Sequence, residues 1–255
     1  MKRSLLATSL LAAMLLAPPS AAAGGVNLAW NNCASEGGTA NRSSACDSNS
    51  GTNILAGSFV VSADLAGVTG VEIVLDLIVG DGISTIPPWW DLNSSTGCRS
   101  GSITMNPTVN PANSVCTDWA AGAAAGGFAA YVGPAYSQGT IALENLPAHR
   151  RIIGGFALPV ADAANLLSTQ EYFAFNLVII NARTLGTPSC AGCTVPACIV
   201  LNSMNVATHD IGVHENITTG TFAGSNLATW QGVGPSCQLV PTKRTTWGGV
   251  KALYR

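Results

Sequence analysis

The sequence predicts an all-β protein, an antiparallel β-sandwich that is stapled by disulfide bonds and contains at most one or two short helices. Several short runs of alternating or β-branched apolar residues are separated by turns rich in Gly, Pro and Asn. Helical periodicity is sparse by comparison. The chain also contains eight cysteines, an even number that favours disulfides in an oxidising compartment. A jelly-roll or an immunoglobulin-like order of strands fits this pattern.

Six runs are expected to form strands, and their pattern indicates which faces are buried. They cover residues 54–63, 71–79, 128–132, 151–158, 171–183 and 198–208. In the second run, alternation places five apolar residues on a core face, namely Val71, Ile73, Leu75, Leu77 and Val79. Glu72 and Asp76 fall on the opposite face, which we expect to be solvated. They lie roughly 13 Å apart, too far for a glycosidase carboxylate pair at ~5–9.5 Å.

The remaining elements follow from local signals. Residues 171–183 and 198–208 are expected to pair as a long hairpin around a cysteine-rich loop. One short helix is expected over residues 159–167, because Pro159 stands where a first helical turn tolerates proline. The end of the chain, residues 245–255, is expected to form an amphipathic tail packed on the body. A docking or sorting signal is the alternative for this tail.

The N-terminus has the three parts of a secretory signal. Lys2 and Arg3 form a basic start, residues 5–17 form an apolar run, and small residues at 21–23 suit signal peptidase. The apolar run is shorter than the ~20 residues of a membrane span, although a retained anchor is the alternative. We therefore expect a signal peptide over residues 1–23, a single β-sandwich domain over 24–244 and the tail over 245–255. The expected location is extracellular, with the periplasm or cell surface as variants.

Charge limits the classes of partner. Loss of Lys2 and Arg3 would leave nine basic against 13 acidic residues, a net charge of −4. Such a mildly acidic chain is a poor candidate for binding nucleic acid or anionic membranes. No later run is apolar and long enough to span a bilayer. A polysaccharide or another surface protein is the expected partner, and no cofactor is predicted.

The cysteines are expected to form four disulfides. They are Cys33, Cys46, Cys98, Cys116, Cys190, Cys193, Cys198 and Cys237. Nearness in sequence suggests the pairs Cys33–Cys46 and Cys98–Cys116, with the other four pairing among themselves. A zinc knuckle at Cys190 and Cys193 is a weaker alternative, because no second ligand pair has the required spacing. A redox dithiol is weaker still, because the motif is bracketed by prolines rather than placed at a helix start.

The most suggestive candidate for ligand binding is the segment Trp89-Trp90-Asp91, which follows two prolines. On an extracellular β-sandwich, an exposed indole could stack on a sugar ring or anchor a protein partner. Adjacent side chains of an extended segment point to opposite sides, so one indole is expected inside and the other outside. The structural alternative is that both indoles serve the core and a disulfide.

Two further clusters contain possible metal ligands or acid–base groups. His209 and His214 each precede an acidic residue, which makes metal binding or a hydrolase site over residues 209–215 conceivable. Their odd spacing puts them on opposite faces of a strand, so a polar turn is the simpler interpretation. Asp47 and Asn49 occupy the first and third positions of a calcium-type loop. The bidentate glutamate at its end is missing, so an Asx-rich turn is the default.

Four motifs together resemble a group of uncharacterised secreted bacterial proteins. They are NLAWNNC at 27–33, PPWW at 87–90, CAGCTVPACIVLNS at 190–203 and TWGGVKALYR at 246–255. The resemblance spans nearly the whole mature chain, but it implies no activity and no catalytic residues. The strand pattern is also similar in outline to cohesin-like and other extracellular β-sandwich modules. A shared fold does not imply a shared function.

The preferred functional hypothesis is a secreted, non-catalytic β-sandwich with a structural, adhesive or binding role. The first alternative is a carbohydrate-binding module that uses Trp89 and Trp90. The second is an extracellular hydrolase with a site around His209, Asp210, His214 and Glu215. No coherent set of catalytic residues favours the hydrolase, and no catalytic residue is predicted.

Overall fold

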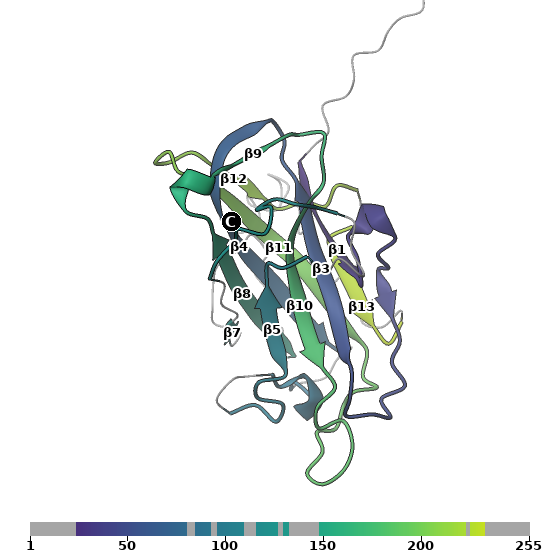
Figure 1. Ribbon diagram of the computed structural model, residues 1–255. Coiled ribbons are helices and arrows are strands. Elements are labelled where there is room, and N and C mark those ends of the chain that lie inside the picture. The colour runs from purple at the N-terminus through teal and green to yellow at the C-terminus, as the bar shows by residue number, and fades with distance from the viewer. Residues whose placement is uncertain are drawn as a thin grey trace, which may run out of the picture.

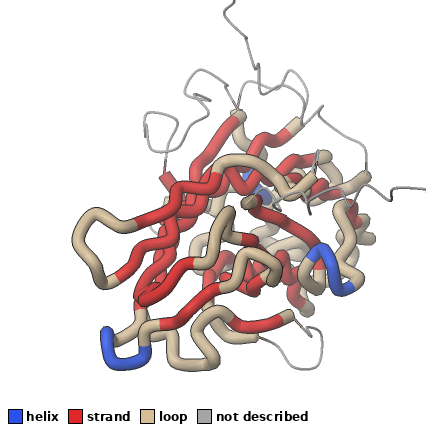
Figure 2. Tube along the Cα trace, turned by 90° about the horizontal axis from the view of Figure 1, so that it is seen from above, coloured by secondary structure: helices blue, strands red, loops and turns tan. Residues whose placement is uncertain are grey.

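The computed structural model describes residues 24–80, 85–92, 96–109, 116–126, 130–132, 148–222 and 225–232. These residues form an all-β sandwich in which two sheets lie face to face (Figure 1). The predicted fold class is therefore confirmed. Figure 2 shows from above that strands dominate. Within the described residues, the helical elements are the 3-10 turns η1 (Ala34–Glu36), η2 (Pro88–Trp90) and η3 (Val160–Asp162).

The smaller sheet has the order β1-β3-β10-β5, with every pair antiparallel. Its strands are β1 (Gly25–Trp30), β3 (Thr52–Val60), β10 (Tyr172–Ile180) and β5 (Ile103–Asn106). The short β6 (Thr117–Asp118) adds to β10 in parallel. Gly57 in β3 gives room to the Phe175 ring, since a Cβ at this position would lie 2.0 Å from that ring. The smaller sheet is thus fitted around a core aromatic side chain.

The larger sheet has the order β2-β13-β11-β4-β8-β7. Its strands are β2 (Asn41–Arg42), β13 (Leu227–Trp230), β11 (Ala197–Thr208), β4 (Leu65–Val79), β8 (His149–Ala157) and β7 (Ala130–Val132). Two short strands pair at its margin: β12 (His214–Ile217) with β11, and β9 (Ala164–Leu166) with β4. The pair β2–β13 is parallel, so the sheets are mainly rather than wholly antiparallel.

The main core lies between the sheets, and the predicted core face of β4 is confirmed. Its five residues at 71, 73, 75, 77 and 79 have at most 1% of their surface exposed. The opposite face of β4 differs from the prediction. Glu72 is exposed, but Asp76 has 0% exposure. The apolar neighbours of Asp76 on that face, Val74 and Ile78, are also buried, so this half of β4 is buried on both faces.

The predicted hairpin between the two long apolar runs is wrong. Strand β10 lies in the smaller sheet between β3 and β5, whereas β11 lies in the larger sheet between β4 and β13. Residues 181–196 therefore cross from one sheet to the other. Both strands are almost wholly buried, so each needs hydrogen-bonding neighbours on both edges. A two-stranded hairpin could not have supplied them.

The helix predicted over residues 159–167 is also wrong. The chain makes the single turn η3 after Pro159 and then becomes extended at Ala163, with φ −54° and ψ 130°. Residues 164–166 continue as β9 and pair with the start of β4. Pairing with a sheet edge therefore overrides the weak local preference for a helix.

The described disulfides join distant segments, which corrects the predicted pairings. They are Cys33–Cys116, Cys46–Cys193 and Cys98–Cys190, with sequence separations of 83, 147 and 92 residues. Cys198 is also disulfide-bonded, and Cys237 lies outside the described residues. Neighbouring cysteines do not pair because the fold places each described partner beside a cysteine from a distant segment, with Cα–Cα distances of 5.9–6.2 Å. The disulfide interpretation of the cysteine-rich loop is confirmed, whereas its closure on itself is not.

Two expected segments lie outside the described residues, namely the signal peptide over 1–23 and the tail over 245–255. In the ranges that the structure describes, no helix has the length and apolar character needed to cross a membrane.

Candidate functional site

The indoles of Trp89 and Trp90 are both buried, with 0% of each residue exposed. Residues 88–90 form the η2 turn instead of an extended segment, so neighbouring side chains need not point to opposite sides. The Trp89 backbone N–H donates to the Ala191 carbonyl at 2.8 Å, which ties η2 to the cysteine-rich loop. The expected division of one indole inside and one outside is therefore wrong. Asp91 ends η2, and its carbonyl accepts the Arg99 backbone N–H.

Four indoles pack together where β4 ends and β11 begins, and we call Trp30, Trp89, Trp90 and Trp230 the tryptophan cluster. Trp89 stacks on Trp230 with ring centroids 5.1 Å apart. Trp90 lies edge-on to both of these rings, at 4.8 and 5.7 Å. Trp30 contacts Trp230 at 6.0 Å. Such offset and edge-to-face contacts add to the stabilisation from burial alone. The double tryptophan motif is therefore a core element.

Arg99 is buried against this cluster. Its guanidinium carbon lies 3.7 Å from the centroid of the Trp89 ring. The same guanidinium donates to the Trp89 and Ala182 carbonyls at 2.9 Å each, and to the Ile180 carbonyl. Burial lowers the pKa of Arg99 to about 10. Its positive charge is thus solvated by carbonyls and an aromatic face, as cation–π packing allows.

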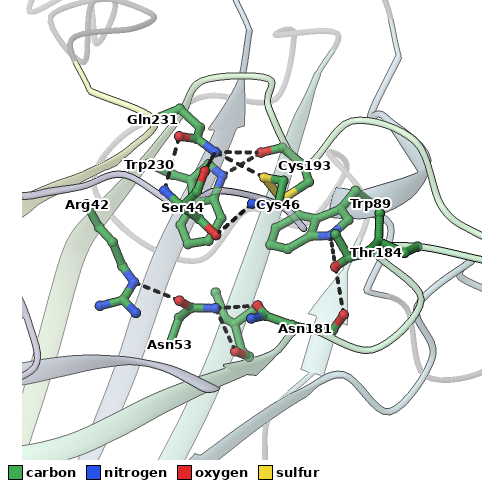
Figure 3. The surroundings of a disulfide bond; sticks show 12 residues. Arg42, Ser44, Cys46, Asn53, Trp89, Asn181, Thr184, Cys193, Trp230 and Gln231 are labelled. Atoms are coloured by element: carbon green, nitrogen blue, oxygen red, sulfur yellow. Dashed lines mark hydrogen bonds between the residues drawn. A yellow bond between two sulfur atoms is a disulfide. The ribbon is translucent and has the colours of Figure 1, made fainter. Parts of the chain in front are cut away.

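The Cys46–Cys193 disulfide lies beside the tryptophan cluster (Figure 3). The Cys193 carbonyl accepts the Trp230 indole N–H at 2.7 Å. The Gln231 amide donates to the Ser44 and Cys193 carbonyls at 2.9 and 3.3 Å. The cysteine-rich loop is thereby joined to Cys46 by a covalent bond and to the end of β13 by hydrogen bonds. Its role in the structure is to hold the sandwich closed.

The candidate calcium ligands Asp47 and Asn49 lie in a turn that pairs with another loop. The Asn49 amide donates to the Leu185 carbonyl at 3.0 Å, and its Oδ1 accepts the Leu185 backbone N–H at 2.8 Å. The side chain of Asn49 thus takes the place of a backbone partner. Asp47 is exposed. The Asx-rich turn explains Asn49 without a metal, and calcium binding stays a prediction.

The candidate residues at 209–215 occupy the loop between β11 and β12 and the start of β12. The His209 ring nitrogen Nε2 lies 3.5 Å from Asp210, and its Nδ1 lies 3.1 Å from the Gly67 carbonyl. Glu215 instead accepts the Ser62 backbone N–H at 2.9 Å. His214 is exposed on β12. No hydrogen bond or ion pair joins His209 or Asp210 to His214 or Glu215, all of which the structure describes. A hydrolase site here stays a prediction.

Among the residues that the structure describes, His, Cys, Asp and Glu side chains do not gather in any group of three or more that could hold a metal ion.

The larger sheet contains a buried ionic cluster that the sequence did not reveal. Asp76 of β4 lies opposite Arg151 of β8, and Asp76 accepts two bonds from that guanidinium at 2.7 and 3.0 Å. His149 Nε2 lies 2.8 Å from the same carboxylate, and the Asn202 amide donates to it as well. At most 1% of any of these four residues is exposed. His149 stands alone in the sequence, and only the β4–β8 register brings it to Asp76.

This cluster keeps Asp76 ionised. Burial alone would raise the pKa of Asp76. Hydrogen bonds with His149, Arg151 and Asn202, together with attraction to Arg151, outweigh burial and lower that pKa. The paired charges are shielded from solvent, so the cluster has the character of a structural ion pair.

A cavity of about 360 Å³ opens on the outer face of the smaller sheet, where β1 begins and β3 ends. We call it the Glu171 pocket, after the carboxylate in its wall. Its other polar lining residues include Asn27, Ser35 and Thr221, and Phe222 stands at its rim with 65% exposure. No sequence motif indicated this site, because its residues come from separate segments.

The Glu171 carboxylate is held in place by neutral donors. Its Oε1 accepts the Asn27 amide at 2.6 Å and the Ser58 hydroxyl at 2.5 Å. Its Oε2 accepts the Ser35 backbone N–H at 3.3 Å. The Thr221 hydroxyl in turn donates to Asn27 Oδ1. The pocket therefore presents a fixed anion whose described partners are all uncharged.

A second, more open hollow of about 460 Å³ lies on the larger sheet. Its lining includes Glu72, Asn205 and the glycines 70 and 155. Glu72 accepts the Asn205 amide at 3.3 Å. This surface lacks an exposed aromatic residue among its described lining, so it is chemically poorer than the Glu171 pocket.

No protein-family model matches the chain, and no curated protein matches it in sequence. The function must therefore be inferred from these sites.

Proposed function

We propose that this chain is a secreted, non-catalytic β-sandwich with a structural, adhesive or binding role outside the cell. The observation that carries the proposal is the burial of the closest histidine–aspartate pair among the described residues. His149 Nε2 lies 2.8 Å from Asp76 Oδ1, but both residues are buried. The Asp76 carboxylate also accepts from Arg151. A general base must reach a substrate proton directly or through one water. A pair enclosed in this way serves the scaffold instead.

The disulfides support the extracellular part of the proposal. Three described disulfides join cysteines that are 83 to 147 residues apart in the sequence. Such bonds persist in oxidising compartments and are rare in the cytosol. Export through a signal peptide over residues 1–23 and the resemblance to secreted bacterial proteins are part of the same proposal, and both stay predictions.

The binding role is favoured over a purely structural one by the Glu171 pocket. Ligand pockets combine apolar side chains with a few fixed polar groups. A carboxylate held in place beside an exposed aromatic ring has this character. The carbohydrate-binding alternative based on Trp89 and Trp90 loses its platform, because both rings are buried.

The proposal is tested by exporting the whole chain from a bacterial host and measuring its intact mass before and after alkylation without reduction. We expect the mass of a chain that begins near Gly24, and no increase in mass after treatment with the alkylating reagent. The purified protein is then incubated with a panel of polysaccharides, peptides and esters. Hydrolysis that co-purifies with the protein to homogeneity would refute the non-catalytic assignment. Free thiols on the exported chain would contradict the disulfide-stapled, extracellular form.

A further inference from the structure

We propose that the Glu171 pocket is a binding site for a neutral polysaccharide. The inference rests on the proposed function and deepens it, because it names the class of ligand and the residues that contact it. At about 360 Å³ the cavity falls within the ~300–1,000 Å³ range of ligand pockets. It lies on the outer face of the smaller sheet and is thus open to solvent.

The first step of the argument is the spare hydrogen-bonding capacity of Glu171. A carboxylate has about four acceptor positions on its two oxygens. Among described partners, Oε1 receives two donors, whereas Oε2 receives one backbone N–H at the long distance of 3.3 Å. Oε2 is therefore able to accept a ligand hydroxyl. Because Asn27 is only 3% exposed and Ser58 is fully buried, the carboxylate is fixed before any ligand arrives.

The second step is the apolar rim. Phe222 is 65% exposed, although burying such a ring stabilises a protein by about 1.5–3 kcal/mol. A sugar ring has an apolar face of C–H groups and a rim of hydroxyls. Phe222 can pack on the face while Glu171 accepts from the hydroxyls. The remaining polar lining, which includes Ser35, Thr169 and Thr221, is uncharged and can donate or accept.

The third step is charge. The described lining of the pocket contains no Lys, Arg or His, and its one ionisable group is the acid Glu171. An anionic ligand would face an uncompensated carboxylate and is disfavoured. An ammonium group could also use Glu171 and Phe222. The several hydroxyl and amide groups around them favour a ligand with many hydroxyls instead.

The test is affinity electrophoresis of the full exported protein in gels that contain neutral polysaccharides, namely hydroxyethylcellulose, xylan, galactomannan, mixed-linkage glucan and starch. We expect retardation in at least one gel. Phe222→Ala should weaken that binding about tenfold, which is the size of effect that loss of one aromatic contact produces. Glu171→Gln should weaken it as well while keeping an acceptor for Asn27 and Ser58.

Matched controls separate the pocket from general surface effects. Val160→Ala removes another exposed apolar side chain, and Glu72→Gln removes an exposed carboxylate on the other sheet. Both should be retarded as strongly as the wild type, with retardation measured for each variant against a gel without polysaccharide because Glu72→Gln also changes the net charge. Retardation that survives Phe222→Ala and Glu171→Gln would overturn the inference, as would retardation in no gel.

Two further outcomes identify which proposal has failed. Shortening of the polysaccharide during the run would refute the non-catalytic function, whatever the pocket binds. Calorimetric titration with glucosamine and glucose tests the ammonium ligand separately. Binding of glucosamine alone, lost in Glu171→Gln, would overturn the neutral ligand while leaving the non-catalytic binding function in place.

Discussion

The two ends of the sandwich differ in how they treat large side chains. At the disulfide end, where β4 ends and β11 begins, the tryptophan cluster and Arg99 are buried beside Cys46–Cys193. At the pocket end, where β1 begins and β3 ends, the molecule exposes apolar side chains instead. Five of the six large exposed apolar residues in the described ranges lie there, namely Val160, Leu167, Ile211, Val213 and Phe222. Figure 1 shows the two ends at the bottom and the top of the sandwich, respectively.

This contrast suggests that one end of the fold provides stability and the other end provides binding, which we call the division of roles. The disulfide end contributes stability through cross-links and close aromatic packing. The pocket end consists of loop tips and short strands, which are the usual places for binding residues on a rigid scaffold. The Cys33–Cys116 disulfide also supports the pocket, because Cys33 immediately precedes the η1 turn that brings Ser35 to the pocket.

The largest expected effect breaks the disulfide end. Trp230→Ala removes a fully buried ring that contacts three other indoles. We expect a loss of about 3–5 kcal/mol in the free energy of unfolding, as is usual for such truncations. Chemical denaturation of the exported protein measures it. Phe222→Ala at the pocket end serves as the comparison, with a change within ~0.5 kcal/mol. Equal losses of unfolding free energy in the two variants would contradict the division of roles between the two ends.

A second large effect is expected in the larger sheet between the two ends. Asp76→Asn leaves Arg151 buried without its counter-charge, which costs about 3–5 kcal/mol when a buried pair is broken. Glu72→Gln, four residues earlier on the same face of β4 but exposed, should change the unfolding free energy by less than ~0.5 kcal/mol. If the two variants unfold at the same denaturant concentration, the Asp76 cluster does not stabilise the fold.

The same cluster predicts a pH dependence. The pKa of Asp76 is lower in the folded protein than its ordinary value, so its contribution is fully present above the unfolded pKa of ~3.9. That contribution is lost as the pH falls through the lower, folded pKa. Denaturation curves at pH 6 and near pH 3 should therefore show a smaller acid-induced loss in Asp76→Asn than in the wild type. An identical loss would assign acid sensitivity to other groups.

A smaller effect is expected from the Cys46–Cys193 bond. Replacing both cysteines by serine removes a cross-link between residues 147 positions apart. The expected loss is about 2–4 kcal/mol, because such a bond restricts the unfolded chain. Hydrogen bonds from Trp230 and Gln231 to the Cys193 carbonyl remain possible, so the variant should still fold. Thermal unfolding without reductant measures the change, and an unaltered midpoint would show that packing alone closes this end.

The sequence predicts those features that depend on local periodicity. Alternation in residues 71–79 identifies the core face of β4, since side chains in any strand alternate. It cannot say which sheet a strand joins. Strands β10 and β11 are both rich in apolar residues and almost wholly buried, and only long-range pairing places them in opposite sheets. The disulfide pairings depend on the same long-range order, so nearness in sequence does not predict them.

The candidate sites were harder to predict than the fold. The sequence predicts that Trp89 and Trp90 diverge as in a strand, but a single 3-10 turn places both side chains inside. His149 meets Asp76 only through the register of β4 and β8. The Glu171 pocket combines Asn27, Glu171 and Phe222, which are far apart in the sequence. None of these associations leaves a short motif, because each depends on the tertiary fold.

The smallest expected effect sharpens the comparison within the pocket end itself. Ile211 is fully exposed at the tip of the β11–β12 loop, away from the described lining of the Glu171 pocket. Ile211→Ser should therefore change the unfolding free energy by less than ~0.5 kcal/mol and leave migration in polysaccharide gels unchanged. Phe222→Ala is the matched variant, equally harmless to stability but expected to weaken binding. If Ile211→Ser weakens binding while Phe222→Ala does not, the contact surface is the loop at residues 209–213, and exposed apolar area rather than the fixed carboxylate determines what this end of the molecule binds.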